Sequence, residues 1–210
     1  MRICQQDTPS HHNTFTSSHQ TNVQQLKYII KYLLSLINDP EQTWKYLKDG
    51  DVDEAKHEYM QNNYYLPLMG VVTLFIFLKT GWGDRFDIET AIKAATSFAA
   101  AFFVGPILAN VLMRQTYGRV MNFKFDNEKL NLFIGYSLSF LMLVRMFSAS
   151  FPHIRFLTFC SFYLFYIIWC AADVYIGIGE KERWKFTVAA FFEIWLSPII
   201  IEKLMSMMMY

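Results

Sequence analysis

Five long apolar segments fill the later part of this 210-residue chain and constrain its fold more than any other feature. They lie at about residues 64–79, 91–113, 130–151, 154–178 and 185–205. A helix needs about 20 apolar residues to cross the hydrocarbon core of a bilayer, and four segments reach that length. Lipid offers the backbone no hydrogen-bond partners, so such segments fold as helices. The sequence predicts an all-α polytopic membrane protein, a five-helix transmembrane bundle.

The first segment is the short one, because its apolar run extends only over the thirteen residues from Leu66 to Leu78. A run of that length also fits a re-entrant or interfacial segment. The distribution of positive charge favours a full crossing. Five spans with the N-terminus inside place ten Lys and Arg on the inner side and five on the outer side, whereas four spans give eight and seven. We therefore expect a cytoplasmic N-terminus and an outside C-terminus, in the cell (inner) membrane or in an endomembrane of a eukaryote.

Ahead of the spans the chain divides into a polar tail (1–22), which we expect to be disordered, and short amphipathic helices at the inner face (23–62), followed by the transmembrane domain (63–210). Apolar residues recur every three or four positions over 24–37, with Lys27 and Lys31 off that stripe. Such a helix either lies in the lipid interface or packs on the protein's own spans. Asp39 and Pro40 begin a second short helix as N-cap and first residue.

The positive charges near the inner side also suggest where lipid or a protein partner binds. We select Lys27, Lys31, Trp44, Arg114 and Arg119 as candidates for a lipid- or partner-facing surface. The first two belong to the amphipathic helix, and the arginines belong to the basic loop at 114–129. The expected partners are the lipid bilayer and an unidentified membrane or cytosolic protein, and a homo-oligomer is also compatible with the sequence.

Four polar residues inside the apolar segments are candidates for an intramembrane polar site: Glu193, Arg145, Asp173 and Asn110. An ionisable group in a span is a functional candidate by default. Arg145 lies roughly 22 Å above the inner end of its segment, so it either extends to the outer headgroups or pairs with Glu193. Glu193 is expected near the midplane and Asp173 near the inner end. Glu193 is either a titratable functional site or a structural hydrogen-bonding group.

Prolines interrupt two spans, at Pro106 and Pro198. Broken helices at mid-depth form ion and substrate sites in transporters. Prolines in spans are also ordinary kinks when neighbours satisfy the carbonyls they free. We find no repeated half, which weakens the transporter interpretation.

The sequence carries no catalytic or cofactor signature: there is no P-loop, no G-x-S-x-G and no dinucleotide fingerprint. The three cysteines lack metal-ligand spacing. We expect no enzyme activity, no cofactor and no bound metal. The net charge of +1 gives no reason to expect nucleic-acid binding.

Several stretches together resemble the Yip family, the Ypt/Rab-interacting membrane proteins, in its short bacterial form. They are NDPEQTWKYL (38–47), YYLPLMG (64–70), FIGYSLSFLMLV (133–144), EKERWKF (180–186) and WLSPII (195–200), and the likeness covers about residues 25–208. The resemblance implies a cytosolic N-terminus and five helices. Eukaryotic members are linked to Rab-type GTPases, but the Asp-Leu-Tyr-Gly-Pro stretch of their N-terminal segment is missing here, so no binding residue carries over.

These observations favour a non-enzymatic membrane scaffold or adaptor of unknown process. The alternative is a small transporter or channel-like protein that uses Glu193 as a titratable intramembrane site.

Overall fold

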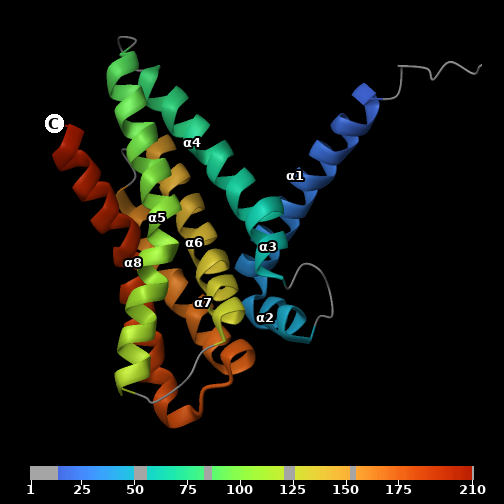
Figure 1. Cartoon of the computed structure of the whole chain (residues 1–210), viewed down its shortest axis with the longest axis vertical. Helices are drawn as coiled ribbons and strands as arrows, with labels where there is room; N and C mark the ends of the chain where they lie inside the picture. The colour runs from blue at the N-terminus through green and yellow to red at the C-terminus, as the bar shows by residue number, and fades with distance from the viewer. Residues whose placement is uncertain (1–13, 50–55, 83–86, 121–125, 152–154, 210) are drawn as a thin grey trace, which may run out of the picture.

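The computed structural model describes residues 14–49, 56–82, 87–120, 126–151 and 155–209, and every element within these ranges is helical (Figure 1). Four helical segments are long and apolar enough to cross a membrane: His57–Gly81, Ile88–Tyr117, Asn127–Ser150 and Phe159–Ile176. A helical membrane bundle is therefore the architecture that length and composition indicate. The fifth predicted segment lies in α8 (Glu180–Met209), which is long enough but carries charges, so its crossing stays a prediction.

The first span is longer than its apolar run suggests. α3 (His57–Met60), a π-helical turn called η2 (Gln61–Tyr65) and α4 (Leu66–Gly81) follow one another without a break. Together they give 25 helical residues, enough to cross the bilayer. Polar residues at 57–63 extend the helix toward the end of the bundle where α2 lies, which a search for apolar residues alone does not detect.

Two helices precede this span, α1 (Thr14–Asn38) and α2 (Pro40–Asp49). Asp39 caps α2 as predicted, because its Oδ1 accepts a hydrogen bond from the Gln42 amide at 3.0 Å. Residues 14–22, which we expected in the disordered tail, are helical. Adding residues to an anchored helix costs far less than starting one. The sequence also favours a third short helix that begins at Asp51 with Glu54 three residues later, and this start lies outside the described residues.

The remaining spans are α5 (Ile88–Val120), α6 (Asn127–Ser150) and a composite helix. This last helix consists of the 3₁₀ segment η3 (Arg155–Phe162), α7 (Tyr163–Ala171) and the π-helical turn η4 (Ala172–Ile176). α8 runs antiparallel to α5 along most of its length, and its C-terminus lies at the end of the molecule opposite α2 (Figure 1). Helix neighbours that alternate in direction fit a chain that crosses repeatedly.

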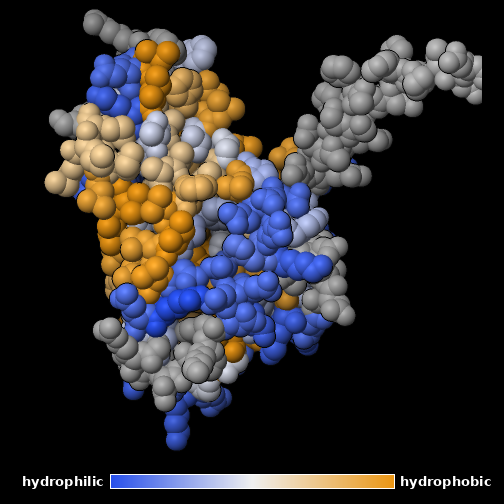
Figure 2. Space-filling model, in the orientation of Figure 1, coloured by the Kyte–Doolittle hydropathy of each residue, from blue (hydrophilic) through white to orange (hydrophobic). Residues whose placement is uncertain are grey.

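α6 forms the centre of the core, where every residue from Leu132 to Met142 is buried. Hydrophobic surface covers the side of the bundle where α5 and α8 lie, and hydrophilic surface covers the end where α2 lies (Figure 2). This division matches a bundle embedded in lipid with its N-terminal helices at one polar boundary. We call the α2 end the inner end, following the charge distribution.

Candidate functional site

A cluster of aromatic side chains joins the N-terminal helices to the spans at the inner end. Trp44 of α2 packs on Tyr175 of η4, with ring centroids 5.2 Å apart, and on Phe133 of α6, at 5.8 Å. Tyr64 of η2 packs on Tyr136 of α6 at 5.0 Å. Tyr28 and Tyr32 of α1 complete the set against these rings. We call these seven residues the inner aromatic cluster.

Hydrogen bonds fasten the same elements. Trp44 donates from Nε1 to the Ile167 carbonyl of α7 at 3.1 Å. The Tyr163 hydroxyl of α7 donates to the Ile37 carbonyl of α1 at 2.6 Å. Trp44, selected from the sequence for a lipid- or partner-facing surface, is instead fully buried. Tryptophan is both apolar and a donor, so a buried carbonyl within reach favours the core position.

α1 presents two adjacent apolar stripes. Ile29, Leu33 and Leu36 are buried against the protein, whereas the neighbouring stripe of Leu26, Ile30 and Leu34 is exposed. Lys27 and Lys31 are exposed beside that second stripe. Packing on the spans and lipid contact were alternatives in the sequence, and the structure gives α1 a surface suited to each. The exposed stripe with flanking lysines is the arrangement of an interfacial helix.

A pocket of about 460 Å³ lies between η2, α5 and α6. Asn110 of α5 reaches into its lining, where its Nδ2 donates to Oδ1 of Asn131 on α6 at 2.5 Å. Arg114, one turn further along α5, is exposed and also lines the pocket. The Arg119 side chain lies outside what the structure describes. Sequence reasoning did not find Asn131, although its place one turn into α6 matches the depth of Asn110.

The intramembrane charges pair differently from the expectation. Arg145 contacts Glu202 through Nη2 and Oε2 at 3.0 Å, and both side chains are 43% exposed. Glu193 instead accepts a hydrogen bond from the Thr116 hydroxyl at 2.5 Å. The structure therefore contradicts an Arg145–Glu193 pair. Glu193 lies nine residues before Glu202 on α8, about 13 Å closer to the inner end.

Thr116, the partner of Glu193, precedes Tyr117, the last residue of the α5 segment that could cross a membrane. The expected depth of Glu193 near the midplane stays a prediction. Its other oxygen, Oε2, is buried and has no hydrogen-bond partner among the described residues. This oxygen is the one observation that keeps Glu193 a functional candidate.

Asp173 pairs with Arg183 of α8, with Oδ2 and Nη2 2.5 Å apart. The Arg183 guanidinium also stacks over the Trp169 ring, 4.6 Å from its centroid, and Nε donates to the Trp169 carbonyl at 3.4 Å. Asp173 thus holds the start of α8 against η4. Asp173 does not pair with Arg145. Its ion pair with Arg183 is a local contact at the inner end.

The two helices that contain an internal proline, α5 and α8, satisfy the carbonyls that these prolines free. Proline at position 106 removes the donor for the Phe102 carbonyl, and the Tyr65 hydroxyl donates to that oxygen at 2.7 Å. Pro198 removes the donor for the Ile194 carbonyl, which accepts from Ser197 Oγ at 3.2 Å. Both helices continue through the prolines. These carbonyls are therefore engaged within the protein, as in ordinary kinks.

Four helices long and apolar enough to cross a lipid bilayer, with amphipathic helices docked at one end, define the chain as a helical membrane protein. No family model, curated protein or solved structure matches the chain. The resemblance to the Yip family stays a prediction.

Proposed function

We propose that this chain is a five-span protein whose N-terminal helices form a fixed platform on the inner side and act as a non-enzymatic scaffold or adaptor. The observation that carries the proposal is the docking of α2, through the buried Trp44 and its bond to the Ile167 carbonyl. An amphipathic hairpin that only anchors in lipid needs no such bond. A surface held in one orientation relative to the membrane suits the binding of another protein.

α8 serves as the fifth span in this proposal. Its charged residues within the bundle have partners, Thr116 for Glu193 and Arg145 for Glu202, which lowers the cost of placing them in a membrane. α8 also lies along α5, which is one of the four apolar helices. The resulting N-inside, C-outside orientation agrees with the excess of positive charge on the inner side.

Three of the stretches in which we noted the resemblance to the Yip family lie side by side in the structure. Trp44 comes from NDPEQTWKYL, Tyr64 from YYLPLMG and Tyr136 from FIGYSLSFLMLV, and these three side chains belong to the inner aromatic cluster. Gly135 lies where an added Cβ would be 2.4 Å from the Met60 methyl group, so glycine permits this close approach of α3 and α6. Three stretches far apart in the sequence thus form one packed unit.

The partner would bind the outward side of α2. This side carries exposed charged and polar residues: Glu41, Gln42, Lys45, Lys48 and Asp49. Deleting residues 24–50 would remove Trp44 and expose the core that it covers. Loss of a partner in that deletion would therefore not show that the partner binds α2. Point changes on the exposed side avoid this problem.

The first experiment is to purify the full chain from its native membrane in mild detergent and measure the mass of the complex. We expect a stoichiometric second protein that is lost in Lys45→Glu and kept in Lys203→Glu, which reverses an exposed charge on α8 near its other end. A homogeneous homo-oligomer with no second protein would contradict the adaptor proposal.

The second candidate, a small transporter, is favoured by one observation, the buried Oε2 of Glu193. It predicts pH-dependent flux in liposomes that Glu193→Gln abolishes and Glu202→Gln leaves intact. Flux that is absent, or that is indifferent to Glu193→Gln, would exclude it. The satisfied carbonyls beside both prolines count against this candidate.

A further inference from the structure

The pocket between η2, α5 and α6 has a polar end and an apolar end. Asn110 and Arg114 line it toward the inner end, and Phe103 and Ile107 line it toward the middle of the span. From Phe103 to Arg114 the helix rises about 16 Å, close to the roughly 15 Å of hydrocarbon in one leaflet. The pocket therefore extends from headgroup level into the acyl-chain region of a single leaflet.

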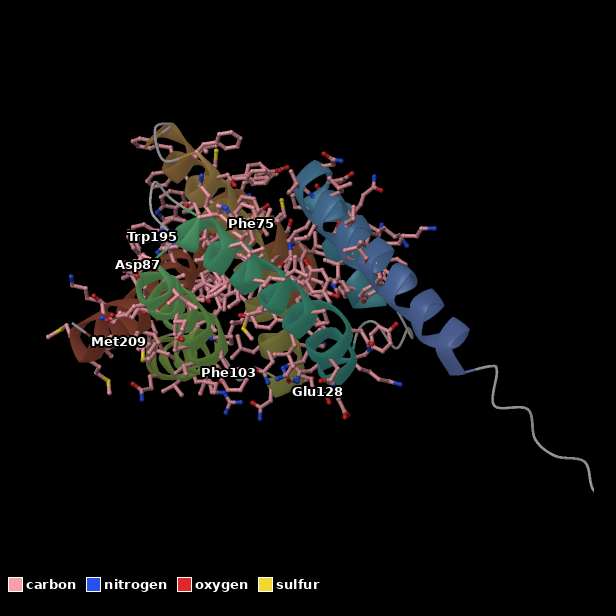
Figure 3. The ribbon with its side chains drawn as sticks, turned by 90° about the horizontal axis from the view of Figure 1, so that it is seen from above. Phe75, Asp87, Phe103, Glu128, Trp195 and Met209 are labelled. Atoms are coloured by element: carbon pink, nitrogen blue, oxygen red, sulfur yellow. The ribbon has the colours of Figure 1, made fainter. Side chains whose placement is uncertain are left out.

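The apolar end opens to the side of the bundle. Phe103, Ile107 and Val111 are all about half-exposed, and their spacing of four residues places them on one stripe of α5. In the view from above, Phe103 of α5 and Glu128 at the start of α6 lie on the same side of the bundle (Figure 3). A lipid diffusing in the bilayer can reach this opening without leaving the membrane.

The polar end favours an anion. Arg114 and His57 are the basic residues that line the pocket, and among the residues that the structure describes no Asp or Glu lines it. Arg114 has no ion-pair partner among the described residues. Amide side chains surround the same end, from Gln61, Asn127 and the Asn110–Asn131 pair. That pair uses one nitrogen and one oxygen, which leaves the Asn131 amide nitrogen as a further donor.

We propose that this pocket binds one anionic phospholipid of the inner leaflet. Its phosphate lies at Arg114 and the amides, and one acyl chain runs along Phe103, Ile107 and Val111. The apolar walls decide between a lipid and a soluble phosphate, because a headgroup alone would leave half of the lining unused. The inference depends on the membrane embedding of α4 to α6 and not on the adaptor role, so either proposal can fail without the other.

The test is native mass spectrometry of the full chain released from nanodiscs that contain equal amounts of phosphatidylglycerol and phosphatidylcholine. We expect one phosphatidylglycerol to be retained in preference to phosphatidylcholine. Arg114→Gln should weaken this preference about fivefold, the ratio that corresponds to about 1 kcal/mol for one basic residue at an anionic lipid surface. Ile107→Trp should reduce retention of both lipids, because the larger ring enters the apolar end.

Two variants serve as matched controls. Lys185→Gln removes an exposed cation of α8 that does not line the pocket, and Ile92→Trp enlarges an exposed residue of α5 outside it. Both should retain phosphatidylglycerol as the unchanged protein does. Equal retention of the two lipids, or equal losses in the controls, would overturn the proposal. Competition by free glycerol phosphate as effective as that by the intact lipid would also overturn it, because the site would then bind a soluble anion.

Discussion

Replacing Trp44 is the most direct way to test whether α2 is fixed to the spans. The side chain is fully buried, contacts rings from η4 and α6, and donates to the Ile167 carbonyl. Removing a buried tryptophan side chain costs about 3–5 kcal/mol. Trp44→Ala should therefore raise the equilibrium constant for undocking of α2 by about a hundredfold or more.

Trp44→Phe separates the two contributions. Phenylalanine keeps most of the ring contact with Tyr175 but lacks the Nε1–H donor. Loss of one hydrogen bond costs about 1 kcal/mol, so the equilibrium constant for undocking should rise about fivefold. Trp44→Ala should favour undocking most and Trp44→Phe less. The control Trp82→Ala, which removes an exposed tryptophan, should change the free energy by at most about 0.5 kcal/mol.

The measurement is hydrogen–deuterium exchange of the chain in nanodiscs, followed by mass spectrometry of a peptide covering α2. A peptide from α6 in the same sample reports whether the spans have opened. We expect faster exchange in α2 with little change in α6. If Trp44→Ala and Trp82→Ala give the same exchange in α2, the docking argument is wrong and the platform loses its support.

Three further predictions follow from individual contacts. A double-mutant cycle with Arg145→Gln and Glu202→Gln, measured by unfolding in a detergent titration, should give a coupling free energy of no more than about 1 kcal/mol. The value is small because both side chains are 43% exposed. A coupling free energy of several kcal/mol would instead place the pair deep in hydrocarbon. Gly135→Val should lower the free energy of unfolding by about 1–3 kcal/mol, because the added side chain clashes with Met60. In the double variant, Met60→Ala should relieve part of that loss. If the two substitutions lower the free energy of unfolding additively, the clash is contradicted. The pKa of Asp87, which precedes the α5 span, is lowered by hydrogen bonds from the Thr90 side chain and backbone and from the Glu89 amide. Its contribution to stability is thus present above the unfolded-state pKa and lost as pH falls through the folded-state value; an NMR titration should show the lowered pKa, and an ordinary value would refute this.

Much of the fold could be predicted because periodicity and length report directly on helices in lipid. The Asp39 cap and the amphipathic stripe of α1 follow from local rules that depend on a few neighbouring residues. The apolar run of the first span gives too short a helix, because helices continue through polar residues once they leave the hydrocarbon. The start of α1 was missed for a similar reason, since polar composition does not by itself prevent a helix from extending.

The partner of Arg145 could have been found from the same arithmetic that gave its depth. Arg145 lies roughly 22 Å above Leu130, and Glu202 lies roughly 25 Å above Lys185, so the two reach similar depths. Glu193 attracted attention because it interrupts a more apolar run. The role of Trp44 could not be found this way, because its acceptor is a backbone carbonyl 123 residues away, and no side-chain pattern marks that oxygen.

The two π-helical turns carry buried tyrosine side chains that pack at the inner end. Successive residues of an α-helix point about 100° apart, so Tyr64 and Tyr65 need neighbours in two directions. In η2 the Tyr64 hydroxyl lies 2.8 Å from Ser139 of α6, while Tyr65 donates to the Phe102 carbonyl of α5. In η4 the buried Tyr175 packs on Trp44.

π-helical turns are rare, and inside α-helices they are frequently found at functional positions. Both turns here, η2 and η4, adjoin the docked N-terminal helices. The prolines of α5 and α8, by contrast, sit in continuous helices with satisfied carbonyls. The two π-helical departures from a regular α-helix therefore both lie at the inner end. An adaptor needs an ordered surface at that end, whereas a transport pathway would place such departures at mid-depth.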